Sequence, residues 1–170
     1  HSNGYSLARR ILFGEKKYQA DSFIPELNKT LGEELLTPTT IYVPVIKELL
    51  LNQKVQLKAL INITGDGLLN LLRVKPSATF TISSLPDTPP VFSLLQQLGN
   101  IPDEEMFSVF NMGIGFCILI HPDDFDEVRA VCHRFGIPCF LLGRVTLSSE
   151  RVVHVVAKGL KGVGRTFYKT

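Results

Sequence analysis

The chain has 170 residues, a length typical of one domain, and 45% of them are hydrophobic while 20% are charged. This composition excludes an intrinsically disordered segment. The 18 basic and 16 acidic side chains give a formal net charge of +2, which argues against a surface that attracts nucleic acid as a whole.

Hydropathy and cysteine usage indicate the compartment. The longest apolar run, Ile114–Ile120, is far shorter than the ~18 residues that a membrane-spanning helix requires. The first residues show no charged-then-apolar leader, so a secretory prefix is absent or already removed, and the chain is a candidate fragment. Cys117, Cys132 and Cys139 are odd in number and lack C-x-x-C spacing. We expect a cytoplasmic protein with reduced thiols, no metal site, and neither a membrane nor a nucleic-acid partner.

The first third of the chain is expected to be mainly helical. Apolar spacing predicts a helix over Gly4–Phe13, followed by a mixed polar stretch from Gly14 to Pro38. A second helix is predicted over Tyr42–Leu51, with Pro44 confined to its first turn. The apolar run Leu57–Ile63 is typical of a strand.

A glycine turn, Thr64-Gly65-Asp66-Gly67, ends this strand, and a short helix is predicted directly after it over Leu68–Val74. Thr79–Ile82 is a further candidate strand. Prolines then begin a helix over Val91–Leu98, which Gly99 ends.

In the second half of the chain, the predicted helices and strands alternate less regularly. A helix is predicted to begin at Pro102, because three carboxylates follow in its first turn. Ile114–Ile120 has the length of a strand, Pro122–Phe135 has helical spacing, and Ile137–Leu142 and Val152–Val156 are rich in residues typical of strands. Helices and strands therefore mix without a strict βαβ repeat, which indicates a single α/β (α+β) domain over residues 1–170.

The C-terminal end is biased in charge. Five basic residues and no acidic ones follow Glu150, and a pair of aromatic residues stands near the end. Because this run is short, residues 157–170 are interpreted as a solvated basic tail rather than a nucleic-acid patch.

Three polar islands interrupt the apolar chain: His1-Ser2-Asn3-Gly4, Thr64–Gly67 and Asn111-Met112-Gly113-Ile114-Gly115. The glycine turn could present backbone N–H groups to a phosphate, although most such turns only reverse the chain. Similarly, the first island could be a simple helix cap and the third a helix stop. The sequence lacks a P-loop and the third glycine of a dinucleotide fingerprint.

The islands also occur in a specific order with other motifs. These are Leu36-Thr37-Pro38-Thr39-Thr40-Ile41-Tyr42-Val43, Pro89-Pro90-Val91-Phe92, Gly99-Asn100, Glu104-Glu105-Met106 and Phe110-Asn111-Met112-Gly113-Ile114-Gly115. From His1 to about Val145, the chain resembles the C-terminal domain of the aminoimidazole ribonucleotide synthetase (phosphoribosylformylglycinamidine cyclo-ligase) family.

The resemblance implies a three-layer domain with a mixed β-sheet flanked by helices. It also implies an ATP-dependent ring closure of formylglycinamidine ribonucleotide in purine biosynthesis, with magnesium. ATP and magnesium would bind mainly to an N-terminal domain absent from this chain, which also builds a homodimer. The isolated domain would then be inactive and would expose an apolar patch where the other domain docks.

The resemblance further implies the site residues. His1 is a candidate proton carrier, although an orienting or merely terminal role is equally open. The candidate substrate and phosphate ligands are Ser2, Asn3, Gly4, Thr64, Gly65, Asp66, Gly67, Asn111 and Gly113.

Two positions of the glycine-turn motif, Asn62 and Asp66, depart from the family pattern and keep alternative functions open. The family usually reads His-Ile-Thr-Gly-Gly-Gly where this chain has Asn62-Ile63-Thr64-Gly65-Asp66-Gly67. A carboxylate beside a phosphate is repulsive, so Asp66 is expected to point away or to meet an amine or a metal. The alternatives are a related ATP-dependent enzyme of the formylglycinamidine synthetase, selenophosphate synthetase or thiamine-phosphate kinase type, or a non-catalytic binding or regulatory module.

Overall fold

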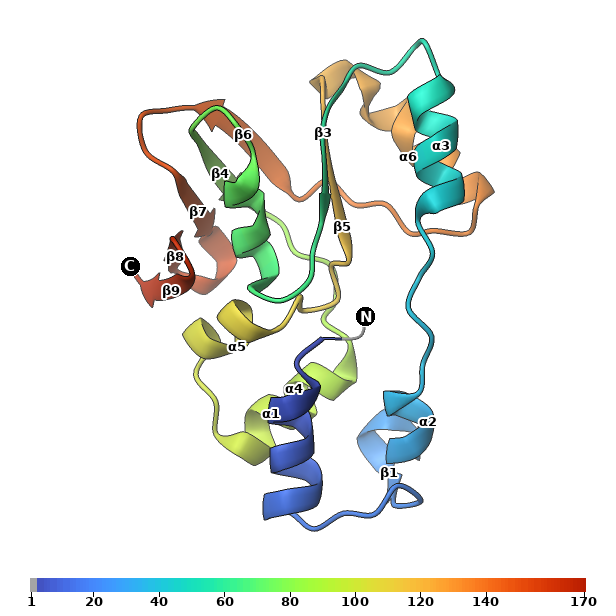
Figure 1. Ribbon diagram of the computed structural model, residues 1–170, viewed down its shortest axis with the longest axis vertical. Coiled ribbons are helices and arrows are strands. Elements are labelled where there is room, and N and C mark those ends of the chain that lie inside the picture. The colour runs from blue at the N-terminus through green and yellow to red at the C-terminus, as the bar shows by residue number, and fades with distance from the viewer. Residues whose placement is uncertain (1–2) are drawn as a thin grey trace.

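The computed structural model describes residues 3–170 and contains one five-stranded sheet (Figure 1). The strand order is β6 (Gly143–Leu147), β4 (Ala78–Ile82), β7 (Val152–Val155), β8 (Leu160–Val163) and β9 (Thr166–Lys169). β4 and β7 are parallel, and every other neighbouring pair is antiparallel. The mixed sheet with accompanying helices is therefore confirmed.

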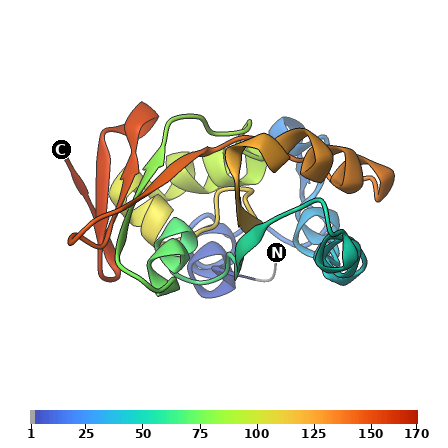
Figure 2. The same ribbon diagram turned by 90° about the horizontal axis from the view of Figure 1, so that it is seen from above.

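A separate two-stranded ladder occupies the middle of the molecule. β3 (Leu57–Asn62) pairs antiparallel with β5 (Phe116–Ile120), with Ile61 opposite Cys117. Figures 1 and 2 show the five-stranded sheet on one side of this ladder and α3 with α6 on the other. The ladder thus connects two hydrophobic cores.

The larger core lies between the sheet and the helices α1 (Tyr5–Arg9), α4 (Pro90–Gly99) and α5 (Asp103–Val109). α1 continues as a π-helix over Arg10–Glu15, so the expected first helix changes its hydrogen-bond pattern midway. The predicted helix after the glycine turn is a 3-10 helix, Gly67–Arg73. Its leucines are buried in this core, which fixes the turn before it against the domain.

The smaller core joins α3 (Val43–Leu51) to α6 (Phe125–Arg134) through Val45, Leu49 and Val131. Both helices were predicted from apolar spacing, and both are confirmed within a few residues at each end.

The stretch 14–38 holds small elements that the sequence did not predict. They are β1 (Phe23–Ile24), β2 (Lys29–Thr30) and α2 (Leu31–Leu35). Thr30 begins α2 with a capping box, because its hydroxyl accepts from the N–H of Glu33 while the Glu33 carboxylate accepts from the N–H of Thr30. Single-turn 3-10 helices complete the fold at Pro25–Leu27, Pro122–Asp124 and Val156–Lys158.

The strand predicted over Ile137–Leu142 is wrong. These residues form no ladder, and the strand begins only at Gly143, which pairs with Ile82. β4 ends at Ile82, and beyond it the Leu142 carbonyl accepts from the N–H groups of Ser83 and Ser84 without continuing the ladder. The apolar character of Ile137–Leu142 has another cause, because Phe140 and Leu141 line a cavity described below.

The solvated tail expected over 157–170 is also corrected. This segment forms β8 and β9, and Leu160 and Phe167 are buried in the main core. The basic side chains pair with carboxylates of the same domain instead of remaining free. The pairs are Lys158–Asp103, Lys161–Glu150, Arg165–Asp66 and Lys169–Glu104.

None of the helices within residues 3–170 is both long and apolar enough to cross a bilayer.

Candidate functional site

Asn3 joins the first polar island to the glycine turn and to the end of α5. Its side-chain Nδ2 donates a hydrogen bond of 3.1 Å to the carbonyl of Val109, at the end of α5. Its Oδ1 lies 3.7 Å from the position that a Cβ on Gly65 would occupy. The first island and the glycine turn are therefore neighbours, although more than 60 residues separate them in the sequence.

Gly4 and Gly67 both pack against the segment from Phe107 to Phe110, too closely for any larger residue. A Cβ on Gly67 would lie 2.5 Å from the carbonyl oxygens of both Phe107 and Phe110, and one on Gly4 would overlap the Phe110 ring. Both glycines also have positive φ, of 52° and 73°. These two candidate ligands thus have a structural reason to be glycine, independent of any ligand.

Gly65 differs from them. It has no left-handed backbone, and an added Cβ would meet only Asn3, at ordinary contact distance. Packing therefore does not explain why this position is glycine.

A buried asparagine that the sequence analysis missed holds the turn. Asn70 is fully buried, and its Oδ1 accepts from the backbone N–H of Thr64 at 2.8 Å and from the Thr64 hydroxyl at 3.3 Å. Its Nδ2 donates to the carbonyl of Gly65 at 2.7 Å. The available signal was one amide among the leucines 68, 69, 71 and 72. The N–H of Thr64 is therefore hydrogen-bonded within the domain. The N–H of Gly67 is too, because it donates to the Thr64 carbonyl.

Asp66 meets amines, which was one of the expected outcomes. Its Oδ1 accepts from Nη2 of Arg165 at 3.0 Å and from Nε at 3.3 Å, and its Oδ2 lies 3.7 Å from Nη2 of Arg73. Its φ of 72° places it in the left-handed region that favours glycine.

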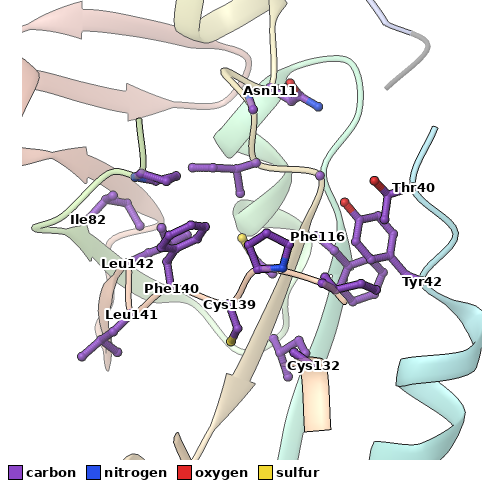
Figure 3. Close-up of a pocket in the computed structure, with 18 of the residues that line it drawn as sticks. Thr40, Tyr42, Ile82, Asn111, Phe116, Cys132, Cys139, Phe140, Leu141 and Leu142 are labelled. Atoms are coloured by element: carbon purple, nitrogen blue, oxygen red, sulfur yellow. Dashed lines mark hydrogen bonds between the residues drawn. The ribbon is translucent and has the colours of Figure 1, made fainter. Parts of the chain in front are cut away.

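The third island forms a tight turn beside a cavity. Asn111 is buried, and its Oδ1 accepts from the N–H of Gly113 at 3.0 Å. Asn3, Asn111 and Gly113 all line a cavity of about 1090 Å³. Figure 3 shows Asn111 at one end of this cavity, above Phe116.

The cavity walls are mainly apolar and aromatic. Tyr42 and Phe116 form one wall, with ring centroids 5.2 Å apart, and Phe140 to Leu142 form the facing wall (Figure 3). Burial raises the pKa of the Tyr42 hydroxyl, so it stays protonated at neutral pH.

Two of the three islands thus line the cavity, and the glycine turn does not. Thr64, Gly65, Asp66 and Gly67 lie outside its lining, although Gly65 lies beside Asn3, which does line the cavity. His1 and Ser2, the remaining candidates, lie outside the described residues.

Three thiols lie in or beside this cavity. Burial raises the pKa of Cys117 to about 12. A hydrogen bond between Cys132 and Cys139 lowers the pKa of the former and raises that of the latter.

The described residues contain no cluster of side chains suited to a metal ion. Within residues 3–170, no group of three or more His, Cys, Asp or Glu side chains is placed to hold a metal ion. The carboxylate in the glycine turn, Asp66, is already engaged by guanidinium groups, which leaves it a poor ligand for a cation.

Known proteins are similar to this chain in sequence. The family described as "AIR synthase related protein, C-terminal domain" matches residues 1–156. A phosphoribosylformylglycinamidine cyclo-ligase from Methanocaldococcus jannaschii is 40% identical over 169 residues, covering 99% of this chain and 46% of that protein. Proteins of the same name from Methanococcus maripaludis and Carboxydothermus hydrogenoformans are 41% and 39% identical, covering 88% and 90% of this chain and 42% and 45% of their own lengths.

The chain therefore spans less than half the length of these curated relatives. Both the family match and the identities cover most of the chain, and so the chain belongs to the family of AIR synthase related proteins, as a C-terminal domain.

Proposed function

We propose that this chain is the substrate-binding C-terminal domain of an ATP-dependent cyclo-ligase. The reaction converts formylglycinamidine ribonucleotide into aminoimidazole ribonucleotide in purine biosynthesis. One observation carries the proposal: Asn3 contacts the glycine turn through Gly65 and the end of α5 through Val109, and it lines the same cavity as Asn111. Relatives that carry this enzyme name align with nearly the whole chain.

The arrangement divides the ligand between two environments. The apolar cavity has room for a small molecule, and the amides of Asn3 and Asn111 supply polar groups at one end. The half-buried backbone at Gly65 can approach a phosphate closely, because Gly65 itself has no side chain. A ribonucleotide matches these three surfaces in order: its ring precursor fits the apolar cavity, its polar sugar the two amides, and its phosphate the backbone at Gly65.

ATP and magnesium belong to another part of the enzyme in this proposal. ATP would supply the phosphoryl group that makes the formamide oxygen of the substrate a leaving group. The described residues offer no carboxylate cluster for the metal, so an N-terminal domain would hold both. This chain would orient the ribonucleotide and exclude water from it.

The surface around the cavity supports a docking partner. Ile41, Val43 and Leu141 are 74%, 72% and 62% exposed, although they are large apolar residues at or beside the cavity rim. An N-terminal domain of the same enzyme would cover them, and a homodimer built by that domain is part of the proposal. We place the enzyme in the cytoplasm, where the three thiols stay reduced.

His1 and Ser2 complete the proposed site as a proton carrier and a phosphate ligand. A His1→Gln variant should then lower kcat and leave the KM for the ribonucleotide nearly unchanged, since glutamine can replace the size but not the proton transfer.

The test is an assay of the intact enzyme, in which this chain is joined to its N-terminal domain. With ATP, magnesium and formylglycinamidine ribonucleotide, it should release ADP and aminoimidazole ribonucleotide. Asn3→Leu should raise the KM for the ribonucleotide, whereas Asn52→Leu, at the distant end of α3, should not. Absence of product from the folded wild-type enzyme would refute the assignment, and profiling with the substrates of related enzymes would then identify the reaction.

A further inference from the structure

The Asp66 carboxylate accepts hydrogen bonds from an arginine that lies outside the family match. Its main partner, Arg165, lies at the tip of the β8–β9 hairpin, whereas the match to the family ends at residue 156. Arg165 donates two hydrogen bonds to the same oxygen, and Arg73 approaches the other oxygen. Two cations thus face one anion at the glycine turn.

The fold holds Arg165 in this place. The hairpin pairs Val163 with Thr166, and Gly164, with φ of 61°, makes the tight bend between them. Next to the tip, the N–H of Phe167 donates to Oγ of Ser108 at 3.1 Å, on α5. α5 is also the helix whose end contacts Gly67, so one element positions both the hairpin and the turn.

Stability does not account for the pair. The side chains of Arg165 and Asp66 are 84% and 26% exposed, and exposed ion pairs contribute little to the free energy of unfolding. The backbone at Asp66 also prefers glycine. A carboxylate at this position therefore contributes little to the stability of the fold, and its pairing with Arg165 calls for an electrostatic reason.

That reason is the neighbouring position. Gly65, directly before Asp66, is where the proposed function places the phosphate. An unpaired carboxylate one residue away would repel a phosphate, and two guanidinium groups reverse the local charge from negative to positive.

We infer that Arg165 is a positioning residue for the ribonucleotide site: it holds the Asp66 carboxylate away from the phosphate and cancels its charge. This inference rests on the proposed function. Arg165 acts through Asp66 and does not itself contact the substrate, which distinguishes it from an ordinary phosphate ligand.

The test is a double-mutant cycle in the intact enzyme, with the KM for formylglycinamidine ribonucleotide as the readout. Arg165→Ala should raise this KM by about tenfold, the size expected for one uncancelled nearby charge, while the KM for ATP changes less than about twofold. The Asp66→Gly/Arg165→Ala double variant should return the KM to within about threefold of wild type. Arg165→Lys should rescue in part, because it restores the charge without the paired donors.

Lys161→Ala is the matched control, because it removes one cation from the same hairpin, and this cation pairs with Glu150 instead of Asp66. It should leave the KM unchanged, and melting temperatures should confirm that every variant folds. An equal effect of Arg165→Ala and Lys161→Ala would overturn the inference. A double variant as impaired as Arg165→Ala alone would overturn it too, since Arg165 would then act directly.

Calorimetry with ribose 5-phosphate separates the inference from the proposed reaction. If the wild-type enzyme forms no product but binds ribose 5-phosphate with the same pattern among the variants, the reaction is wrong and the role of Arg165 holds. If it forms product while the variants match the control, only the inference fails. Neither product nor binding would overturn both.

Discussion

Asn70 and Thr64 are joined by two hydrogen bonds to one buried amide oxygen, of 2.8 Å from the Thr64 N–H and 3.3 Å from its hydroxyl. The Nδ2 of the same amide donates to the Gly65 carbonyl. The Asn70 side chain thus supplies hydrogen-bond partners to backbone groups of a turn that no neighbouring strand pairs. The shape of the glycine turn therefore depends on one side chain of the helix that follows it.

Replacing this side chain should destabilise the whole domain. Asn70→Ala leaves the Thr64 N–H and the Gly65 carbonyl without these partners, at a cost of about 2–3 kcal/mol in the free energy of unfolding. Urea denaturation measures the change. Asn52→Ala removes the half-buried hydrogen bond to Glu127 and the one that Asn52 Oδ1 accepts from the Lys54 N–H. It should cost less, about 1 kcal/mol, because these groups remain partly accessible to water. Equal losses in the two variants would mean that Asn70 does not hold the turn.

The two glycines of the turn should respond differently to alanine. Gly67→Ala should destabilise the domain by about 1–3 kcal/mol, because its Cβ would press on two backbone carbonyl oxygens at a positive φ. Gly65→Ala should change stability by no more than about 0.5 kcal/mol and yet weaken the binding of ribose 5-phosphate, measured by calorimetry. A bulky residue at Gly67 would report on folding rather than on the site. Unchanged binding in Gly65→Ala would remove this turn from the proposed phosphate site.

Buried Cys117 makes a specific contribution to the pH dependence of stability. Burial raises its pKa from 9.0 to about 12 in the folded state, so unfolding at high pH releases a proton. Its contribution is fully present below pH 9 and should fall by about 1.4 kcal/mol per pH unit between pH 9 and 12. Cys117→Val should flatten this decline relative to wild type in denaturation curves at pH 8, 9 and 10. A parallel decline in both proteins would show that the thiol ionises without penalty in the fold.

The C-terminal hairpin should matter through its apolar residues and little through most of its charges. Phe167→Ala should cost about 3–5 kcal/mol, because this ring is fully buried and meets Phe107 edge to face. Lys169→Ala removes only a 3.9 Å pair with Glu104 and should cost about 0–1 kcal/mol. Thermal unfolding compares the two variants. Comparable losses would favour the solvated basic tail that the sequence suggested.

Local periodicity was sufficient for much of the fold. The helical spacing of Val43, Ile46 and Leu50 predicted α3, although the structure buries Val45 and Leu49 instead. The apolar run at Leu57 predicted β3, and the glycine turn between strand and helix was recognised correctly. These features depend on neighbours in the chain, which a sequence displays directly. The family could also be recognised, because the order of short motifs is a property of the sequence alone.

The remaining features depend on contacts between distant residues. Basic residues beyond Arg151 resembled a free tail, because nothing in their own sequence reveals that Asp103, Glu104 and Asp66 lie opposite. The run Ile137–Leu142 has the composition of a strand, but β4 ends before it could pair there. Composition records what a residue tolerates, whereas pairing requires a partner at hydrogen-bond distance, and only the tertiary structure places that partner. For the same reason, Asn3 and Gly65 could be predicted from the sequence as two separate candidate ligands, and only the tertiary structure shows that they lie side by side.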